Sequence, residues 1–106
     1  VINMPISIDD YQFDGPFVSA DWLRHTSGIY AVLDKRLDGS LFVVDIGQSG
    51  DVKDRVRNHD RKMCWRGSAR GDLRYAALYT PGETVIRRET IERVLRNKFN
   101  PPCGEI

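Results

Sequence analysis

The sequence predicts a mixed α/β fold of the α+β type, in which a small three-stranded antiparallel sheet is flanked by helices. Two runs rich in β-branched and aromatic residues, 28–33 and 41–47, lie on either side of Asp38-Gly39, and this pattern signals a β-hairpin. Residues 73–79 read as a third strand, and apolar residues at helical spacing predict a final helix from about 84 to 99. The expected order is therefore strand, strand, helix, strand, helix.

The composition is that of one small globular domain. The chain has 106 residues, of which 41% are apolar and 29% charged. It contains no apolar run long enough to span a membrane and no signal-peptide pattern, so we expect a cytoplasmic protein without a membrane partner. Two cysteines, Cys64 and Cys103, do not make a disulfide framework, and we expect reduced thiols.

The chain divides into an N-terminal arm, residues 1–27, and the main domain, residues 28–106. The arm shows no clear period, and its aromatic residues are expected to pack it onto the domain. Within residues 60–72, which are basic and contain glycines, we expect a loop with Met63 and Trp65 packed beneath it.

The hairpin register follows from the turn. If Asp38-Gly39 is a two-residue loop, Leu33 faces Val44 and Ala31 faces Ile46 on one side of the sheet, which is apolar and expected to be buried. On the other side Tyr30 faces Gly47 and Val32 faces Asp45. A tyrosine, a carboxylate and a glycine on one face mark a place where a ligand could approach the sheet.

A short helix is predicted directly after the second strand. Ser49 is a suitable N-cap, and Val52 and Val56 form a thin apolar stripe at i and i+4. Arg55 and His59 are also four residues apart, so they share a face and can reach back toward the polar side of the hairpin.

The final helix carries a glutamate at the margin of its apolar side. Thr84 or Glu83 can cap this helix, and Glu92 lies next to the apolar Ile91. Arg88 and Arg96 are four residues from Glu92 on either side, so a surface salt bridge is one explanation of this residue.

Charge is distributed unevenly along the chain. Residues 1–52 hold eight acidic and three basic side chains, whereas residues 53–74 hold eight basic and three acidic ones, a net charge of +5. This basic segment is suited to a polyanion bound to one face of the molecule. The alternative is a solvated helix and loop without a partner.

Taken in order, these features resemble the GIY-YIG nuclease domain. The resemblance rests on Gly28-Ile29-Tyr30, then Asp45-Ile46-Gly47-Gln48-Ser49, then Arg55 with His59 four residues later, and finally Glu92 ahead of Pro101-Pro102-Cys103. It covers about three-quarters of the chain. It implies a small antiparallel sheet flanked by helices and metal-dependent cleavage of phosphodiester bonds, with DNA as the expected partner.

The resemblance also implies roles for individual residues. Glu92 would hold Mg²⁺ or Mn²⁺, hard ions that prefer oxygen ligands and keep several waters. Arg55 would clamp the scissile phosphate. Tyr30 would position or deprotonate the attacking water and pass its proton to His59, which is alternatively a base or a phosphate ligand. Further substrate contacts are expected from Gly28, Gly47, Arg57, Arg61, Lys62 and Arg66. The basic ones, together with Arg70, would make sequence-independent contacts to neighbouring phosphates.

Two positions depart from the family pattern. Asp45 stands where the family usually has a second tyrosine, and Gly104 stands where an asparagine commonly follows the final helix. Asp45 either adds a carboxylate to the metal site, repels the phosphate, or pairs with Lys53 or Arg55. The alternative function is therefore a catalytically impaired module that binds nucleic acid or another protein. Specificity would come from residues 60–72, the arm, a protein partner or a second copy of the chain.

Overall fold

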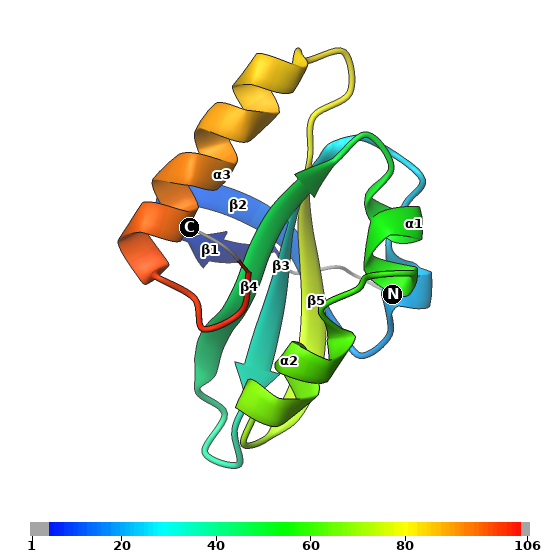
Figure 1. The fold of residues 1–106 in the computed structure, drawn as a ribbon. Helices are drawn as coiled ribbons and strands as arrows, with labels where there is room; N and C mark the ends of the chain where they lie inside the picture. Colours follow the sequence, from blue (N-terminus) through cyan, green and yellow to red (C-terminus); the bar gives the residue numbers. More distant parts are fainter. Residues whose placement is uncertain (1–4, 105–106) are drawn as a thin grey trace.

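A computed structural model describes residues 5–104 and has an α+β fold (Figure 1). Residues 1–4 of the predicted arm and 105–106 of the predicted domain lie outside the described residues. The strands are β1 (Ile6–Ile8), β2 (Tyr11–Phe17), β3 (Gly28–Lys35), β4 (Leu41–Ser49) and β5 (Asp72–Tyr79). The helices are the 3₁₀ turn η1 (Ala20–Trp22), α1 (Val52–Arg57), α2 (Lys62–Ser68) and α3 (Val85–Phe99).

The strands form one antiparallel sheet in the order β1-β2-β5-β3-β4. The three predicted strands are confirmed as β3, β4 and β5. The expectation of a three-stranded sheet is wrong, because the N-terminal arm adds β1 and β2. β2 pairs with β5, about sixty residues later in the chain. Gly15 and Pro16 lie inside β2, and because both residue types are uncommon in strands, the local sequence did not indicate a strand there.

Helices cover the sheet on both faces. Figure 1 shows α3 on one side of the sheet and α1 and α2 on the other. Ile91 and Leu95 of α3 pack with Ile29, Ala31 and other residues of one sheet face. A second apolar cluster on the other face joins the sheet to α1 and α2; its members include Tyr30, Val32, Val52, Val56 and Trp65. The face expected to be open to a ligand is therefore largely buried.

The centre of the hairpin has the predicted register, but its turn is longer than predicted. Tyr30 pairs with Gly47, Ala31 with Ile46 and Val32 with Asp45, as predicted. The loop holds three residues, 37–39, because the N–H of Arg36 bonds to the carbonyl of Ser40. A bulge at Val44 compensates, so that Leu33 pairs with Val43 and Val44 joins the face of Tyr30.

The helix ends agree with the sequence pattern for α3 and differ for α1. The Thr84 side chain accepts a hydrogen bond from the Arg87 N–H and so caps α3 as predicted. The cap of α1 is Asp51, which accepts from the Asp54 N–H, whereas the predicted cap, Ser49, is the last residue of β4. Within residues 5–104, no helix is both long and apolar enough to cross a membrane.

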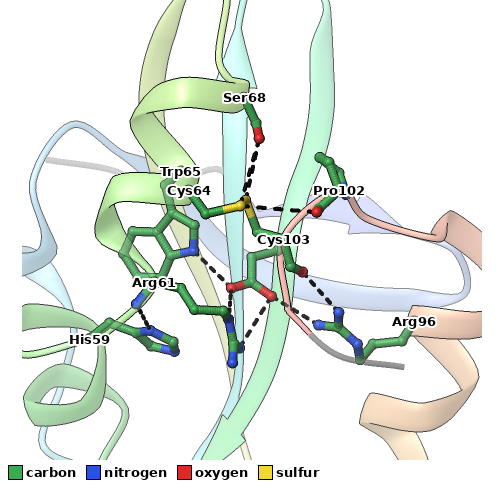
Figure 2. The surroundings of a disulfide bond; sticks show 9 residues. His59, Arg61, Cys64, Trp65, Ser68, Arg96, Pro102 and Cys103 are labelled. Carbon is green, nitrogen blue, oxygen red and sulfur yellow. Dashed lines mark hydrogen bonds and ion pairs between the residues drawn. A yellow bond between two sulfur atoms is a disulfide. The ribbon is translucent and has the colours of Figure 1, made fainter.

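The segment predicted as a loop, residues 60–72, contains α2, and Trp65 of this helix is buried while Met63 is exposed. One turn of α2 lies beside the segment that follows α3, and there Cys64 forms a disulfide with Cys103, with Cα atoms 5.9 Å apart (Figure 2). The expectation of reduced thiols is therefore wrong. It rested on the number of cysteines, whereas packing brings together two residues separated by 39 positions.

A pair of glycines tests how closely the α2–β5 connection approaches β3. A Cβ at Gly71 would lie 2.0 Å from the backbone oxygen of Lys35, but one at Gly67 in α2 would meet nothing within 4 Å. We predict that Gly71→Ala lowers the free energy of unfolding by about 2 kcal/mol or more, because backbone must move. Gly67→Ala should leave it unchanged or raise it by up to about 1 kcal/mol. Urea denaturation measures both, and equal effects would contradict this packing.

Candidate functional site

The Asp45 carboxylate is the most heavily bonded polar group of the sheet. Asp45 is fully buried in β4. Its Oδ2 accepts from Nε of Arg61 at 2.9 Å and from Nε1 of Trp65 at 2.8 Å, and its Oδ1 accepts from Nη1 of Arg96 at 2.9 Å. Figure 2 shows these three side chains converging from different segments. Two guanidinium groups and an indole thus neutralise a carboxylate that would otherwise be costly to bury.

Tyr30 and His59 form a second buried polar contact on the same face. The Tyr30 hydroxyl lies 2.6 Å from Nε2 of His59, and the two residues are 2% and 5% exposed. The sequence predicted that His59 reaches this side of the hairpin, and this is where it lies. His59 follows α1 instead of continuing it, because the helix ends at Arg57 with Asn58 as its C-cap.

The backbone of Arg61 determines which imidazole nitrogen of His59 carries the proton. The Arg61 N–H donates to Nδ1 at 3.0 Å, so Nδ1 accepts. In the neutral ring the proton is then on Nε2, which donates to the Tyr30 oxygen. This arrangement leaves the Tyr30 O–H free to donate to another group. It does not suit the expected transfer of the Tyr30 proton to His59, since Nε2 already holds a proton.

Burial shifts both groups toward their neutral forms. The pKa of Tyr30 rises to about 12, chiefly through burial and then through the negative charge of Asp45. The pKa of His59 falls to about 4, again chiefly through burial, with the positive charges of Arg55 and Arg61 adding to the effect. At neutral pH the pair is a phenol and a neutral imidazole.

Arg55 and Glu92 lie near this pair and are partly open to solvent. The Arg55 guanidinium bonds to the exposed Asp60 at 3.2 Å, a surface pair that a phosphate can replace at little cost. Both Arg55 and Glu92 act electrostatically on the Tyr30 hydroxyl. Arg88 and Arg96, the predicted partners of Glu92, bond instead to Gln48 and Asp45. Burial raises the pKa of the half-buried Glu92, against the lowering effect of Arg96 and Arg61.

The two glycines predicted to contact phosphate do not border open space. A Cβ at Gly47 would lie 2.1 Å from the Tyr30 hydroxyl, so Gly47 lets the Tyr30 side chain cross β4. A Cβ at Gly28 would lie 2.3 Å from the backbone oxygen of Leu78 on the neighbouring strand. These glycines permit close packing of protein against protein.

Among Arg57, Arg61, Lys62 and Arg66, Arg61 is partly buried and the other three are surface groups. Arg61 is bonded to Asp45, so it belongs to the site interior. Arg57 pairs with Asp21 at 3.4 Å on the surface, and Lys62 donates to the backbone oxygen of Arg57. Arg66 is exposed on α2.

A metal ion bound here would have a single carboxylate ligand and would stay mostly hydrated. Among residues 5–104, no three His, Cys, Asp or Glu side chains gather to enclose an ion. The Asp45 oxygens already accept hydrogen bonds from three side chains, so Asp45 is unsuited to bind a metal ion. Its observed role, as the acceptor of a buried network, is none of the three that the sequence suggested. Glu92 remains as a partly exposed carboxylate, and Mg²⁺ is commonly held by one or two carboxylates together with phosphate and water.

Two residues at the site were not expected from the sequence. Arg96 was assigned to Glu92 by helical spacing, and Trp65 was expected only to pack. Both serve Asp45, and Arg96 also donates to the backbone oxygens of Ile46 and Cys103. The one available signal was the buried aspartate itself, because a carboxylate in an apolar strand requires partners elsewhere in the chain.

Removing the charge of Asp45 tests the buried network. We predict that Asp45→Asn lowers the free energy of unfolding by about 3 kcal/mol or more, since two guanidinium groups lose their counter-charge in the interior. Asp60→Asn is the matched control: its side chain is 75% exposed, and the change should cost less than about 1 kcal/mol. Urea unfolding at pH 7 compares them, and a similar small cost for both would contradict the role of the network.

The neutral imidazole of His59 predicts a pH dependence. Its pKa is lower in the folded protein than in the unfolded chain, so the unfolded chain binds the extra proton and stability falls as pH drops from about 6.5 toward 4. A shift of this size corresponds to about 3 kcal/mol over that window. Burial raises the pKa of Glu92 in the folded protein, so near the acid end of this pH window Glu92 adds stability as pH falls.

The variant His59→Gln should lose most of this slope, whereas His25→Gln, at an exposed histidine, should keep it. Because Glu92 is unchanged in both variants, the difference between them isolates His59. Chemical denaturation at several pH values between 7 and 4.5 measures the slopes, and parallel curves for the two variants would disprove the assignment.

No family model, no curated protein and no solved structure matches the chain. Any function proposed for this chain therefore rests on the arrangement of its own residues.

Proposed function

We propose that this protein is a divalent-metal-dependent endonuclease that hydrolyses phosphodiester bonds in DNA, with a site of the GIY-YIG type. The observation that carries the proposal is the 2.6 Å contact between the Tyr30 hydroxyl and His59 Nε2, with Arg55 and Glu92 acting on the same hydroxyl. These four residues come from three separate stretches of the chain, since Arg55 and His59 are only four positions apart. Charged and polar groups from three stretches that act on one hydroxyl are what a shared phosphodiester site requires.

The order of elements supports the same proposal. The series β3, β4, α1, β5, α3 is the order expected from the resemblance, and α2 is inserted between α1 and β5. Tyr30 lies on β3, and Glu92 lies on α3 next to the buried Ile91. The additional strands β1 and β2 extend the sheet beyond β5, away from β4.

Each side chain has a role that its surroundings permit. Glu92 would hold Mg²⁺ or Mn²⁺, which supplies Lewis acidity toward phosphate oxygens. Arg55 exchanges Asp60 for the phosphate and neutralises part of its charge. Tyr30, protonated at neutral pH, donates its O–H to the attacking water or to a phosphate oxygen and so orients it. His59 holds the phenol in place through Nε2–H.

A second candidate is a non-catalytic module on the same fold, which binds nucleic acid or another protein. The observation that favours it is the burial of Tyr30 and His59 and the complete pairing of Asp45, which leaves little reactive surface on the sheet. A nucleic-acid module would show salt-dependent binding without cleavage, and a protein-interaction module would show no nucleic-acid affinity even at low salt.

A plasmid-nicking assay separates these candidates. We predict that the protein nicks supercoiled DNA with Mg²⁺ or Mn²⁺ and not with a chelator. Glu92→Gln should lower the rate by at least about 100-fold, because the only carboxylate proposed for the ion is lost. Glu89→Gln, an exposed glutamate one turn earlier on α3, should leave the rate unchanged. Equal residual nicking by wild type and Glu92→Gln would refute the proposed endonuclease activity.

A further inference from the structure

A basic hollow of about 440 Å³ lies at the end of the sheet formed by the β3–β4 hairpin and the α2–β5 connection. In Figure 1 both connections lie at the same end of the molecule, below the labels of α2 and β5. This basic hollow is lined by Lys35, Arg36, Leu37, Arg70, Gly71, Asp72 and Arg74.

The basic hollow carries a strong excess of positive charge. Four of its seven lining residues are cations and one, Asp72, is an anion. Lys35, Arg70 and Arg74 form no ion pair with any other residue in the range 5–104. Lys35 and Arg70 are exposed. Cations gathered in a concave, polar place raise the local concentration of anions and attract them from a distance.

A buried carboxylate fixes the wall of the basic hollow. Asp34, which is 1% exposed, accepts from the backbone N–H of Arg70 at 2.9 Å and of Gly71 at 2.7 Å, and from Nε of Arg36 at 3.1 Å. Burial acts to raise the pKa of Asp34, but these hydrogen bonds outweigh it and hold the pKa below its ordinary value. Asp34 is therefore ionised at neutral pH and ties both connections to β3.

Two further contacts limit movement of the same wall. The Arg36 guanidinium lies over the Phe42 ring, 3.7 Å from its centre. Gly71 approaches the backbone of Lys35 so closely that no side chain fits between them. The cations are thus carried by a backbone that is organised before any ligand arrives, which lowers the entropic cost of binding.

We propose that the basic hollow binds phosphate groups of a nucleic-acid backbone, at a place separate from the Tyr30–His59 contact. Its chemistry selects phosphate: planar guanidinium forks and an ammonium group face a polar hollow, and Leu37 is the one apolar side chain among the lining residues. The choice of a nucleic-acid backbone over a free phosphate compound rests on the proposed function. The basic hollow supplies affinity without reading sequence.

Fluorescence anisotropy with a duplex of about 20 base pairs, in a chelating buffer, tests this proposal. Lys35→Gln/Arg70→Gln removes two exposed charges from the basic hollow, and Arg87→Gln/Arg93→Gln removes two exposed charges from α3. We expect the first variant to bind about tenfold more weakly near 100 mM salt, with a salt slope smaller by nearly 2. The control should bind within about twofold of wild type.

A second measurement uses the unmodified protein. Acetylation of lysines with and without the duplex should show protection of Lys35, whereas Lys98, which pairs with Asp9 on the surface, should stay reactive. Reactive Lys35 in the complex would overturn the proposal even if the double variant failed to fold. Inorganic pyrophosphate tests the other source of phosphate. If pyrophosphate protects Lys35 and the duplex does not, the site is for free phosphates and the proposal is wrong.

These experiments distinguish this proposal from the proposed function. Binding in chelator requires neither a metal ion nor Glu92. A protein that binds DNA through Lys35 and Arg70 but never nicks it refutes the enzyme alone. If the protein nicks DNA but its double variant binds as tightly as wild type, only the proposed phosphate binding at the basic hollow is refuted. Absence of DNA binding by wild type at low salt, both in chelator and with Mg²⁺, refutes both.

Discussion

The Asp45 carboxylate is the constraint on which the candidate site depends. A charge buried in the middle of β4 must be met by donors, and these come from the segment before α2, from α2 itself and from α3. Once Arg61 is held by Asp45, its backbone N–H lies at Nδ1 of His59. That hydrogen bond sets the tautomer of His59 and thereby the direction of its contact with Tyr30. Asp45 thus holds in position the residues proposed for the site.

Covalent and ionic links converge on the same few residues. Cys64 directly precedes Trp65, and the Cys103 N–H bonds to the carbonyl of Val44, directly before Asp45. The carbonyl of Cys103 accepts from Arg96. The disulfide therefore connects α2, which carries Trp65, to the segment after α3, whose Cys103 carbonyl accepts from Arg96. A short helix such as α2 has little stability of its own, and these links give it a fixed place.

Local patterns predicted the elements whose signals are local. The β3–β4 hairpin, β5 and the Thr84 cap of α3 depend on strand-forming runs, Asp38-Gly39 and a capping residue. The central register was correct because a longer turn and the bulge at Val44 offset each other. Pairing of β2 with β5, the cover that α1 and α2 give the second sheet face, and the partners of Asp45 depend on contacts between distant segments. Period and propensity carry no information about those contacts.

The positions of the two proposed sites along β3 are compatible with a single extended ligand. Tyr30 and Asp34 are four residues apart on one face of β3, a separation of about 13 Å at the usual rise of a strand. Phosphates on one strand of duplex DNA advance by about 3.4 Å per base pair, so this separation corresponds to about four base pairs. Asp45 and Asp34 are both buried carboxylates of the sheet, and each pairs with arginine. At Asp45 two arginine side chains are neutralised. At Asp34 the carboxylate pairs with Arg36 and with the backbone N–H of Arg70, so the Arg70 side chain stays exposed. The proposed phosphate-binding hollow and the Tyr30–His59 pair thus lie toward different ends of one strand.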